Sequence, residues 1–274
     1  MSLLYQSRDA HLVDYQLYQL PGCRGRFRGP PPASDNYVAC VGAAQTFGRF
    51  VQTPFPRLLA ASLGIDTLNL GRGGAGPTFP LHDPGIMEYI NRARVVIVQF
   101  FSGRSQSNSL FQTVNHGMYG INLANGTQVS ADQFYTWLMS QDPDLARRII
   151  AETRDNYVAD MTRLLAAIEP PKILLWFSTR TPEYSETWEL PIWRLWGRFP
   201  QFVNQAMAAQ LRGHADVYLE CTTSRGSPQP IVDSSGRPAS NSYYPAPEMH
   251  EDAANVLLPA CREILAGGSW NPRT

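Results

Sequence analysis

The chain has 274 residues, of which 43% are hydrophobic and 17% charged, so it is long enough and apolar enough to bury a sizeable core. Its 23 basic and 23 acidic residues cancel, which gives no reason to expect a nucleic-acid or membrane partner. Lys172 is the one lysine, and this excess of arginine fits either genomic base composition or side chains that bind anions through both guanidinium edges.

Residues 1–36 are expected to be irregular. After them, short apolar runs alternate with amphipathic segments. The runs predicted to be strands are 37–41, 65–70, 94–100, 172–178 and 215–220. The segments predicted to be helices are 55–63, 84–93, 142–168, 201–211 and 250–265. This alternation predicts a single α/β domain, a three-layer α/β/α fold with a flavodoxin-like parallel five-stranded sheet in the order 2-1-3-4-5.

Two insertions interrupt the alternation. Residues 102–129 are polar and rich in Gly and Asn, and residues 179–200 contain Trp188, Trp193 and Trp196. Long loops in a compact domain often serve as lids or binding loops. The tryptophans are open to two interpretations, packing in the core or at an interface, or facing a ligand.

Ligands of an open parallel sheet bind beyond the carboxyl ends of its strands. Segments 42–49, 69–76 and 102–108 follow the first three predicted strands, and 245–250 precedes the last helix, so these four segments should converge. Glycines there let backbone N–H groups approach a ligand, and Arg49 and Arg104 could bind an anion or form structural salt bridges. The candidate substrate- or anion-binding residues are Gly42, Ala44, Gln45, Arg49, Asn69, Gly71, Gly74, Gly103, Arg104 and Asn108.

The first of these segments resembles a motif of the SGNH hydrolase superfamily, named for blocks of Ser, Gly, Asn and His on a flavodoxin-like sheet. That family begins with a Gly-Asp-Ser turn. Gly42 matches it, but Ala43 stands at the Asp position and Ala44 at the position of the nucleophilic Ser. The resemblance therefore implies the fold without a serine nucleophile at this position.

The other blocks match in part. Gly71 or Gly74 fits the oxyanion glycine, and Gly103 fits the third block, although Arg104 follows it and Asn108 comes later. In the last block His250 fits. Pro247 occupies the position of the family's Asp, and Glu248 comes one residue later.

Two further resemblances concern the same region. The stretches F-R-G-P (27–30), T-F-G-R-F-V (46–51) and P-F-P (54–56) are similar to a bacterial family of unknown function. Gly42 and Gln45 also match polysaccharide-biosynthesis proteins whose first loop reads Gly-Asn-Cys-Gln, with Ala44 in place of the Cys. The resemblance to the bacterial family brings no established reaction with it.

The candidate catalytic residues are His250, Glu248, Thr46 and Ser102. A neutral His250 could act as general base, with Glu248 or Glu251 setting its tautomer, or it could be a surface histidine. Thr46 or Ser102 could supply a nucleophilic hydroxyl, or they could make ordinary hydrogen bonds.

These residues support two hypotheses. The first is a group-transfer enzyme or hydrolase of SGNH type, in which His250 deprotonates a saccharide-like hydroxyl or a water for acyl or sulfuryl transfer. The second is a non-catalytic protein that binds a carbohydrate or an anion on the same fold. The expected partner is a small-molecule or saccharide substrate, with homo-oligomerisation left open.

The cysteine spacing and the absence of targeting patterns set the expectations for metals, cofactors and cellular compartment. The cysteines Cys23, Cys40, Cys221 and Cys261 form no C-x-x-C pair, so we expect buried free thiols and no metal site. No cofactor is required, although an activated donor would suit the first hypothesis. Because no signal-peptide pattern and no run of about 18 apolar residues is found, the expected compartment is the cytoplasm.

Overall fold

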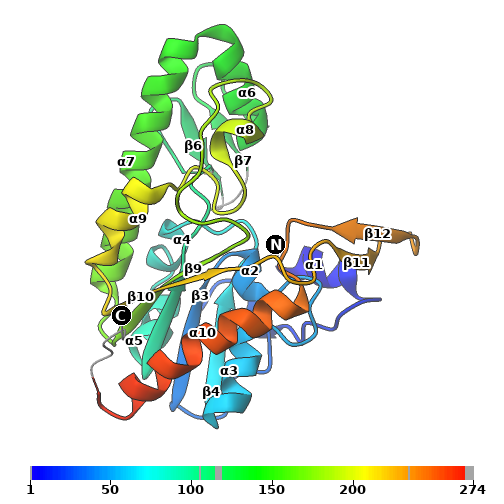
Figure 1. Cartoon of the computed structure of the whole chain (residues 1–274), viewed down its shortest axis with the longest axis vertical. Coiled ribbons are helices and arrows are strands. Elements are labelled where there is room, and N and C mark those ends of the chain that lie inside the picture. The colour runs from blue at the N-terminus through cyan, green and yellow to red at the C-terminus, as the bar shows by residue number, and fades with distance from the viewer. Residues whose placement is uncertain (1, 105, 115–118, 234, 269–274) are drawn as a thin grey trace.

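The centre of the molecule is a parallel sheet. A computed structural model describes residues 2–104, 106–114, 119–233 and 235–268. Its main sheet has five strands in the order β10-β9-β5-β3-β4, all parallel (Figure 1). The strands are β3 (Tyr37–Gly42), β4 (Asp66–Gly71), β5 (Val95–Gln99), β9 (Lys172–Ser178) and β10 (Val217–Thr222). In chain order this is 5-4-3-1-2, the predicted order counted from the opposite edge, so the flavodoxin-like α/β fold is confirmed.

Alternate side chains of each strand face opposite layers of helices. Val38 and Cys40 of β3 pack with α3 and α10, whereas Ala39 and Val41 pack with α5, α7 and α9. This alternation is the period-2 geometry of a strand buried on both faces. The flanking helices are α2 (Ala44–Phe47), α3 (Phe55–Leu63), α4 (Thr78–Leu81), α5 (Pro84–Asn91), α7 (Pro143–Ala167), α9 (Gln205–Arg212) and α10 (Pro247–Leu265).

Capping residues explain where two of these helices depart from the expected bounds. Helix α9 begins at Gln205 rather than at residue 201, because the Asn204 side chain accepts a hydrogen bond from the Met207 N–H. Helix α10 begins at Pro247, three residues before His250, because proline is favoured in the first turn. His250 therefore lies inside the helix and not at its start.

The insertions contain more regular structure than expected. The first holds an antiparallel sheet of β6 (Phe111–Thr113), β7 (Tyr119–Asn122) and β8 (Thr127–Ser130), and α6 (Ala131–Gln141) follows it. Residues 105 and 115–118 of this insertion lie outside the described residues. The second insertion contains α8 (Trp193–Trp196). Together with the adjacent end of α7, these elements form the upper lobe, which encloses its own apolar cluster around Phe134, Tyr135 and Trp196 (Figure 1).

The first 36 residues were expected to be irregular, but they contain α1 (Ser2–Asp9), β1 (Tyr18–Gln19) and β2 (Arg26–Phe27). Helix α1 lies beside a hairpin of β11 (Gln229–Val232) and β12 (Pro238–Asn241) (Figure 1). All four cysteines are buried and free. Within the described residues, no helix combines the length and apolar character needed to cross a bilayer.

Candidate functional site

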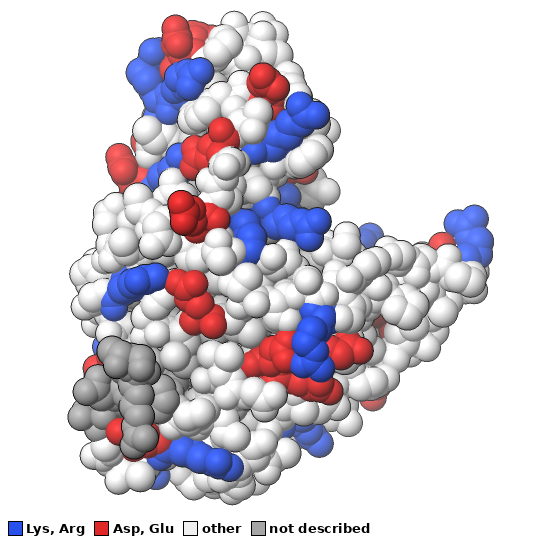
Figure 2. Space-filling view, in the orientation of Figure 1, with Lys and Arg blue, Asp and Glu red and all other residues white. Residues whose placement is uncertain are grey.

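A cleft opens at the carboxyl ends of the main strands, between the sheet and the upper lobe. Its volume is about 440 Å³, which is within the usual range of small-molecule sites. Figure 2 shows the molecule hollowed between the upper lobe and the arm formed by hairpin β11–β12. We call it the aromatic cleft; its principal lining residues are Gln45, Arg104, Asp132, Phe177, Tyr184, Trp193, Trp196, Arg198, Phe199, Gln201, Tyr243 and Tyr244.

A second, small cavity of about 30 Å³ adjoins the aromatic cleft. It is lined by Ala44, Gly74 and Ser102, so the structure brings these three predicted residues together. The space is sufficient for a water molecule but not for a sugar. The two cavities share five residues, which form a partition between them: Gln45, Arg104, Phe199, Tyr243 and Tyr244.

Gln45 is the most unusual polar residue of the partition. Its side chain is 1% exposed, and neither amide atom has a hydrogen-bond partner among the described residues. The Gln201 side-chain oxygen, in the wall of the same cleft, is also buried without a described partner. A buried amide without partners costs roughly 1–3 kcal/mol, so these groups represent unused hydrogen-bonding capacity beside the cleft.

Arg104 lines the aromatic cleft, whereas Arg49 does not line it and forms an ion pair with Asp9. The Arg104 guanidinium forms an ion pair with Asp132 at 3.3 Å and lies over the rings of Trp196 and Tyr243. The Arg49 guanidinium donates to Asp9 at 2.8 and 3.2 Å and to the Tyr244 hydroxyl at 3.0 Å. Of the two roles predicted for Arg49, the structure shows the structural salt bridge, which attaches α1 to the partition.

His250 is 0% exposed and lies in the core. Its ring stacks on Phe55 at 6.0 Å between centroids and meets Phe177 edge-on at 5.4 Å. Its Nδ1 accepts a hydrogen bond from the Phe55 N–H at 3.1 Å, and its Nε2 has no partner within the described chain. Burial, with a smaller contribution from the Arg28 charge, lowers the pKa of His250 to about 3. The expectation of a surface or active-site histidine does not fit this arrangement, because the imidazole is enclosed by aromatic rings and is a very weak base.

The other predicted catalytic groups do not assemble around this histidine. The Thr46 hydroxyl is fully buried and donates to the Gln99 side-chain oxygen at 2.6 Å. Glu248 lies in the first turn of α10, close to Gly226, and lines neither cavity. Ser102 reaches the small cavity, where its oxygen accepts from the Arg104 N–H at 3.4 Å.

Several predicted binding residues have structural roles instead. The Asn108 amide donates to Tyr135 and Thr153 and accepts from two backbone N–H groups, which fixes the start of the upper lobe. The Asn69 amide joins the Thr46 carbonyl to the Gly71 N–H.

The predicted glycines permit close backbone packing. A Cβ at Gly42 would collide with the Thr46 side chain, and one at Gly71 would collide with the backbone of Phe47, so both glycines let α2 pack directly on the sheet. Gly103 donates its N–H to the Gln201 carbonyl at 2.8 Å and so supports the wall of the cleft.

Segment 179–203, which forms one wall of the cleft, is held by two arginines. The Arg180 guanidinium donates to the carbonyls of Arg198, Pro200 and Val203 at 2.6 to 3.0 Å. Burial lowers the pKa of Arg180 to about 10. Arg154 of α7 pairs with Glu186 at 2.6 Å. Trp196 lies in the core of the upper lobe, which is the predicted packing role, and Trp193 is 61% exposed and lines the cleft.

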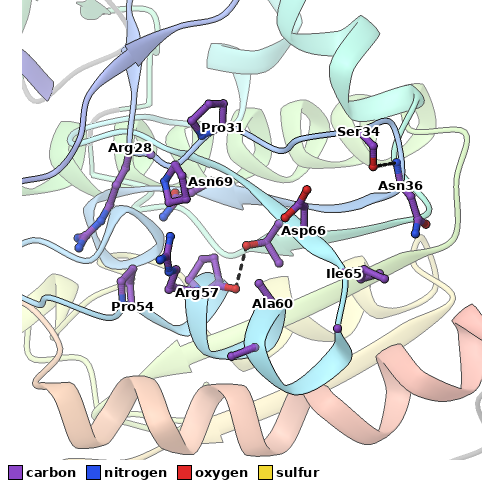
Figure 3. A pocket seen from close by; sticks show the side chains of 16 residues that line it. Arg28, Pro31, Ser34, Asn36, Pro54, Arg57, Ala60, Ile65, Asp66 and Asn69 are labelled. Atoms are coloured by element: carbon purple, nitrogen blue, oxygen red, sulfur yellow. Dashed lines mark hydrogen bonds between the residues drawn. The ribbon is translucent and has the colours of Figure 1, made fainter.

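A larger groove of about 540 Å³ lies along the edge strand β4, away from the carboxyl ends (Figure 3). Two of its charged side chains, Arg28 and Asp66, are already engaged, whereas Arg57 lines the groove without an ion pair among the described residues. The Arg28 guanidinium donates to the carbonyls of Phe47, Gly48, Val51 and Gln52, and Asp66 accepts from the Ala33 N–H. The rest of the wall is largely Pro, Ala and Gly, so the aromatic cleft is the stronger candidate site.

Sequence reasoning missed the residues that cover the small cavity. Tyr5 of α1 contacts it from one side, and Tyr243 and Tyr244 from the segment before α10. The position of segment 242–245 beside the last helix was an available signal, since that helix begins at the carboxyl edge. No sequence pattern predicts that α1 lies beside the small cavity, because the contact between Tyr5 and the cavity arises from tertiary packing. No group of three or more residues suited to a metal ion is found among the described residues.

Comparisons with solved structures return carbohydrate esterases. A family 2 carbohydrate esterase with a carbohydrate-binding domain from Corynascus thermopiles (Myceliophthora fergusii) is 14% identical over 88% of this chain and 70% of that chain, with a TM-score of 0.44. A family two carbohydrate esterase from Clostridium thermocellum, in complex with cellohexaose, is 9% identical over 88% and 68%, with a TM-score of 0.47. A catalytic mutant of an acetylxylan esterase from Geobacillus stearothermophilus is 14% identical over 87% and 97%, with a TM-score of 0.42. At these values the similarities carry no argument about the activity of this chain.

The sequence itself matches one family. No curated protein matches the chain. A protein-family profile covers residues 1–116 and 132–265, which is most of the sequence and includes every residue of the partition between the two cavities. The chain therefore belongs to the family described as Domain of unknown function (DUF6473).

Proposed function

We propose that this protein binds a hydroxyl-rich, saccharide-like ligand in the aromatic cleft and does so without a serine nucleophile. The observation that carries the proposal is the buried Gln45 amide, whose oxygen and nitrogen both lack partners in the described chain. An amide offers one acceptor and an adjacent donor. Neighbouring hydroxyls of a sugar offer the complementary donor and acceptor.

The walls of the cleft suit the rest of such a ligand. Trp193, Tyr243 and Phe199 present apolar ring faces, on which the C–H faces of a sugar can pack. Arg180 and Arg154 already hold segment 179–203 in place. Binding of a ligand would therefore cost little conformational entropy in this wall of the cleft. The Gln45 amide atoms are covered in the unliganded protein, so binding would require a neighbouring side chain of the partition to move aside.

A hydrolase or transferase is the less favoured function for this geometry. Ala44 carries no nucleophile, and the His250 ring is enclosed between Phe55 and Phe177. Direct transfer to a saccharide hydroxyl would need a base that reaches the cleft, and a group with a pKa of about 3 is poorly matched to neutral pH.

An array of immobilised oligosaccharides tests the proposal. The wild-type protein should bind a subset of glycans, and Gln45→Leu and Trp193→Ala should each lower the signal at least tenfold. Gln210→Leu on α9 and Trp137→Ala on α6, both outside the cleft, serve as controls and should bind as the wild type does.

The same array also tests catalysis. Release of acetate from acetylated glycans by the wild-type protein would favour the enzyme hypothesis. Absence of binding to every glycan would contradict the proposed function.

A further inference from the structure

The aromatic cleft carries more positive than negative charge. Its charged lining residues are Arg104, Asp132, Arg194 and Arg198. Asp132 neutralises Arg104, and Arg194 lies 3.7 Å from Glu189 in a pair whose side chains are both largely exposed. Such exposed pairs are weak and are easily exchanged for a ligand.

Arg198 is the unmatched cation. Within the described part of the chain, Arg198 takes part in no ion pair, although its backbone carbonyl accepts from Arg180 at 3.0 Å. Its main chain is therefore fixed at the wall of the cleft while its side chain can still turn toward a ligand. A guanidinium presents a planar fork of donors that matches a carboxylate or a sulfate ester.

We propose that the ligand of the aromatic cleft is an acidic saccharide, whose hydroxyls bind Gln45 and whose anionic substituent binds Arg198. This inference rests on the proposed function and adds the charge of the ligand to it. Because Arg198 is exposed, its attraction to the anion is screened by salt. The shared chemistry is a singly charged oxyanion on a sugar ring, and its source is either a uronic-acid carboxylate or a sulfate ester.

Titration calorimetry with three probes tests this inference: tri-galacturonate, its neutral methyl ester, and galactotriose bearing sulfate esters. We expect at least one charged probe to bind ten or more times as tightly as the methyl ester, with affinity falling as salt rises from about 20 to 200 mM. Arg198→Gln should lower affinity for that probe about tenfold and leave affinity for the methyl ester unchanged. Arg148→Gln, an exposed arginine of α7 outside the cleft, is the matched control and should change neither.

The outcomes separate the two proposals. Equal affinity for charged and neutral probes, or an Arg198→Gln variant with unchanged affinity for the charged ones, would overturn the acidic ligand while leaving saccharide binding in place. Failure of all three probes to bind, together with an empty glycan array, would overturn both. Tighter binding of the carboxylate or of the sulfate probe identifies the source of the anion, and either result supports the inference.

Discussion

Two buried side chains, Gln45 and His250, each leave a hydrogen-bonding group without a described partner. The protein bears a stability cost at both, but only Gln45 borders a cavity. A polar group that lacks a partner beside a ligand site lowers the stability of the free protein but remains available to bind the ligand. Gln45 should therefore affect both stability and ligand binding, whereas His250 should affect stability alone.

Replacing Gln45 should stabilise the unliganded protein. In Gln45→Leu an apolar group of similar size removes the buried amide, so we expect the free energy of unfolding to rise by about 1 kcal/mol while glycan binding is lost. Urea denaturation measures the first effect, with Gln210→Leu on the surface as the control. A fall in stability of more than about 1 kcal/mol would mean that the amide has a partner in solution, such as a bound water.

His250 should make stability depend on pH. Its pKa is about 3 in the folded protein and near 6.5 when unfolded, so between these values the unfolded chain binds a proton that the folded chain does not. His250 therefore favours folding fully above about pH 6.5, and this contribution is lost as the pH falls toward 3.

The matched variant is His250→Asn, which retains an acceptor for the Phe55 N–H but does not titrate in this range. The free energy of unfolding, obtained from urea denaturation at several pH values between 7 and 4, should fall more steeply for the wild type, by up to about 1.4 kcal/mol per pH unit. Parallel curves for the two proteins would show that the imidazole is accessible and titrates near its ordinary pKa. That result would reopen its role as a base.

Among the elements, one arginine of the N-terminal segment, Arg28, joins that segment to α2 and to the turn after it. Arg28 donates to the carbonyls of residues 47, 48, 51 and 52, and its guanidinium lies over the rings of Tyr15 and Phe47. Burial lowers the pKa of Arg28 to about 10, so it stays charged at neutral pH. The F-R-G-P and T-F-G-R-F-V stretches thus meet in a structural contact rather than in the candidate site.

Removing that contact should be costly. We expect Arg28→Met to lower the free energy of unfolding by about 3 kcal/mol, because several buried carbonyls lose a charged donor at once. Thermal or urea unfolding measures this loss. Arg26→Met, at an exposed position of β2, should change stability by less than about 0.5 kcal/mol. Similar results for the two variants would contradict the structural role of Arg28.

The wall of the cleft depends on Arg180 in the same way. Arg180→Met should release segment 179–203 from the wall, make its backbone susceptible to chymotrypsin after Trp188 and Trp193, and weaken glycan binding at least tenfold. Limited proteolysis followed by mass spectrometry locates the cleavage, and Arg212→Met on α9 is the control. Unchanged proteolysis in Arg180→Met would show that the Arg154–Glu186 pair holds the segment without it.

At the scale of the whole molecule, the sheet places the turn after β3 next to the small cavity, whose described lining includes no histidine and no carboxylate. Ala44→Ser should therefore restore no ester hydrolysis, because the new hydroxyl would have no accessible imidazole to take its proton. Hydrolysis of p-nitrophenyl acetate by the variant should equal that of the wild type. A tenfold or greater increase would show that His250 can reach the cavity, and would favour the enzyme hypothesis over the binding function.

The sequence alone was sufficient for the central sheet. Apolar runs of five to seven residues separated by amphipathic segments determine βαβ units, and β9 and α3 begin and end at the predicted residues. The sequence also predicted that Ala44, Gln45, Gly74, Ser102 and Arg104 lie near one another, and all five line the small cavity. This prediction was possible because the carboxyl ends of parallel strands always meet at one edge of the sheet.

Only the tertiary structure decided what that edge can do. Whether a histidine is a base or a core residue depends on what packs around it, and no local pattern records that Phe55 and Phe177 enclose His250. The pairing of Arg49 with Asp9, and the approach of Tyr5 and Tyr243 to the cavity, join segments far apart in the chain. Local patterns determine secondary structure because hydrogen bonding and side-chain periodicity act over a few residues. Burial and charge pairing act through space, so the chemistry of the site is set by the folded chain.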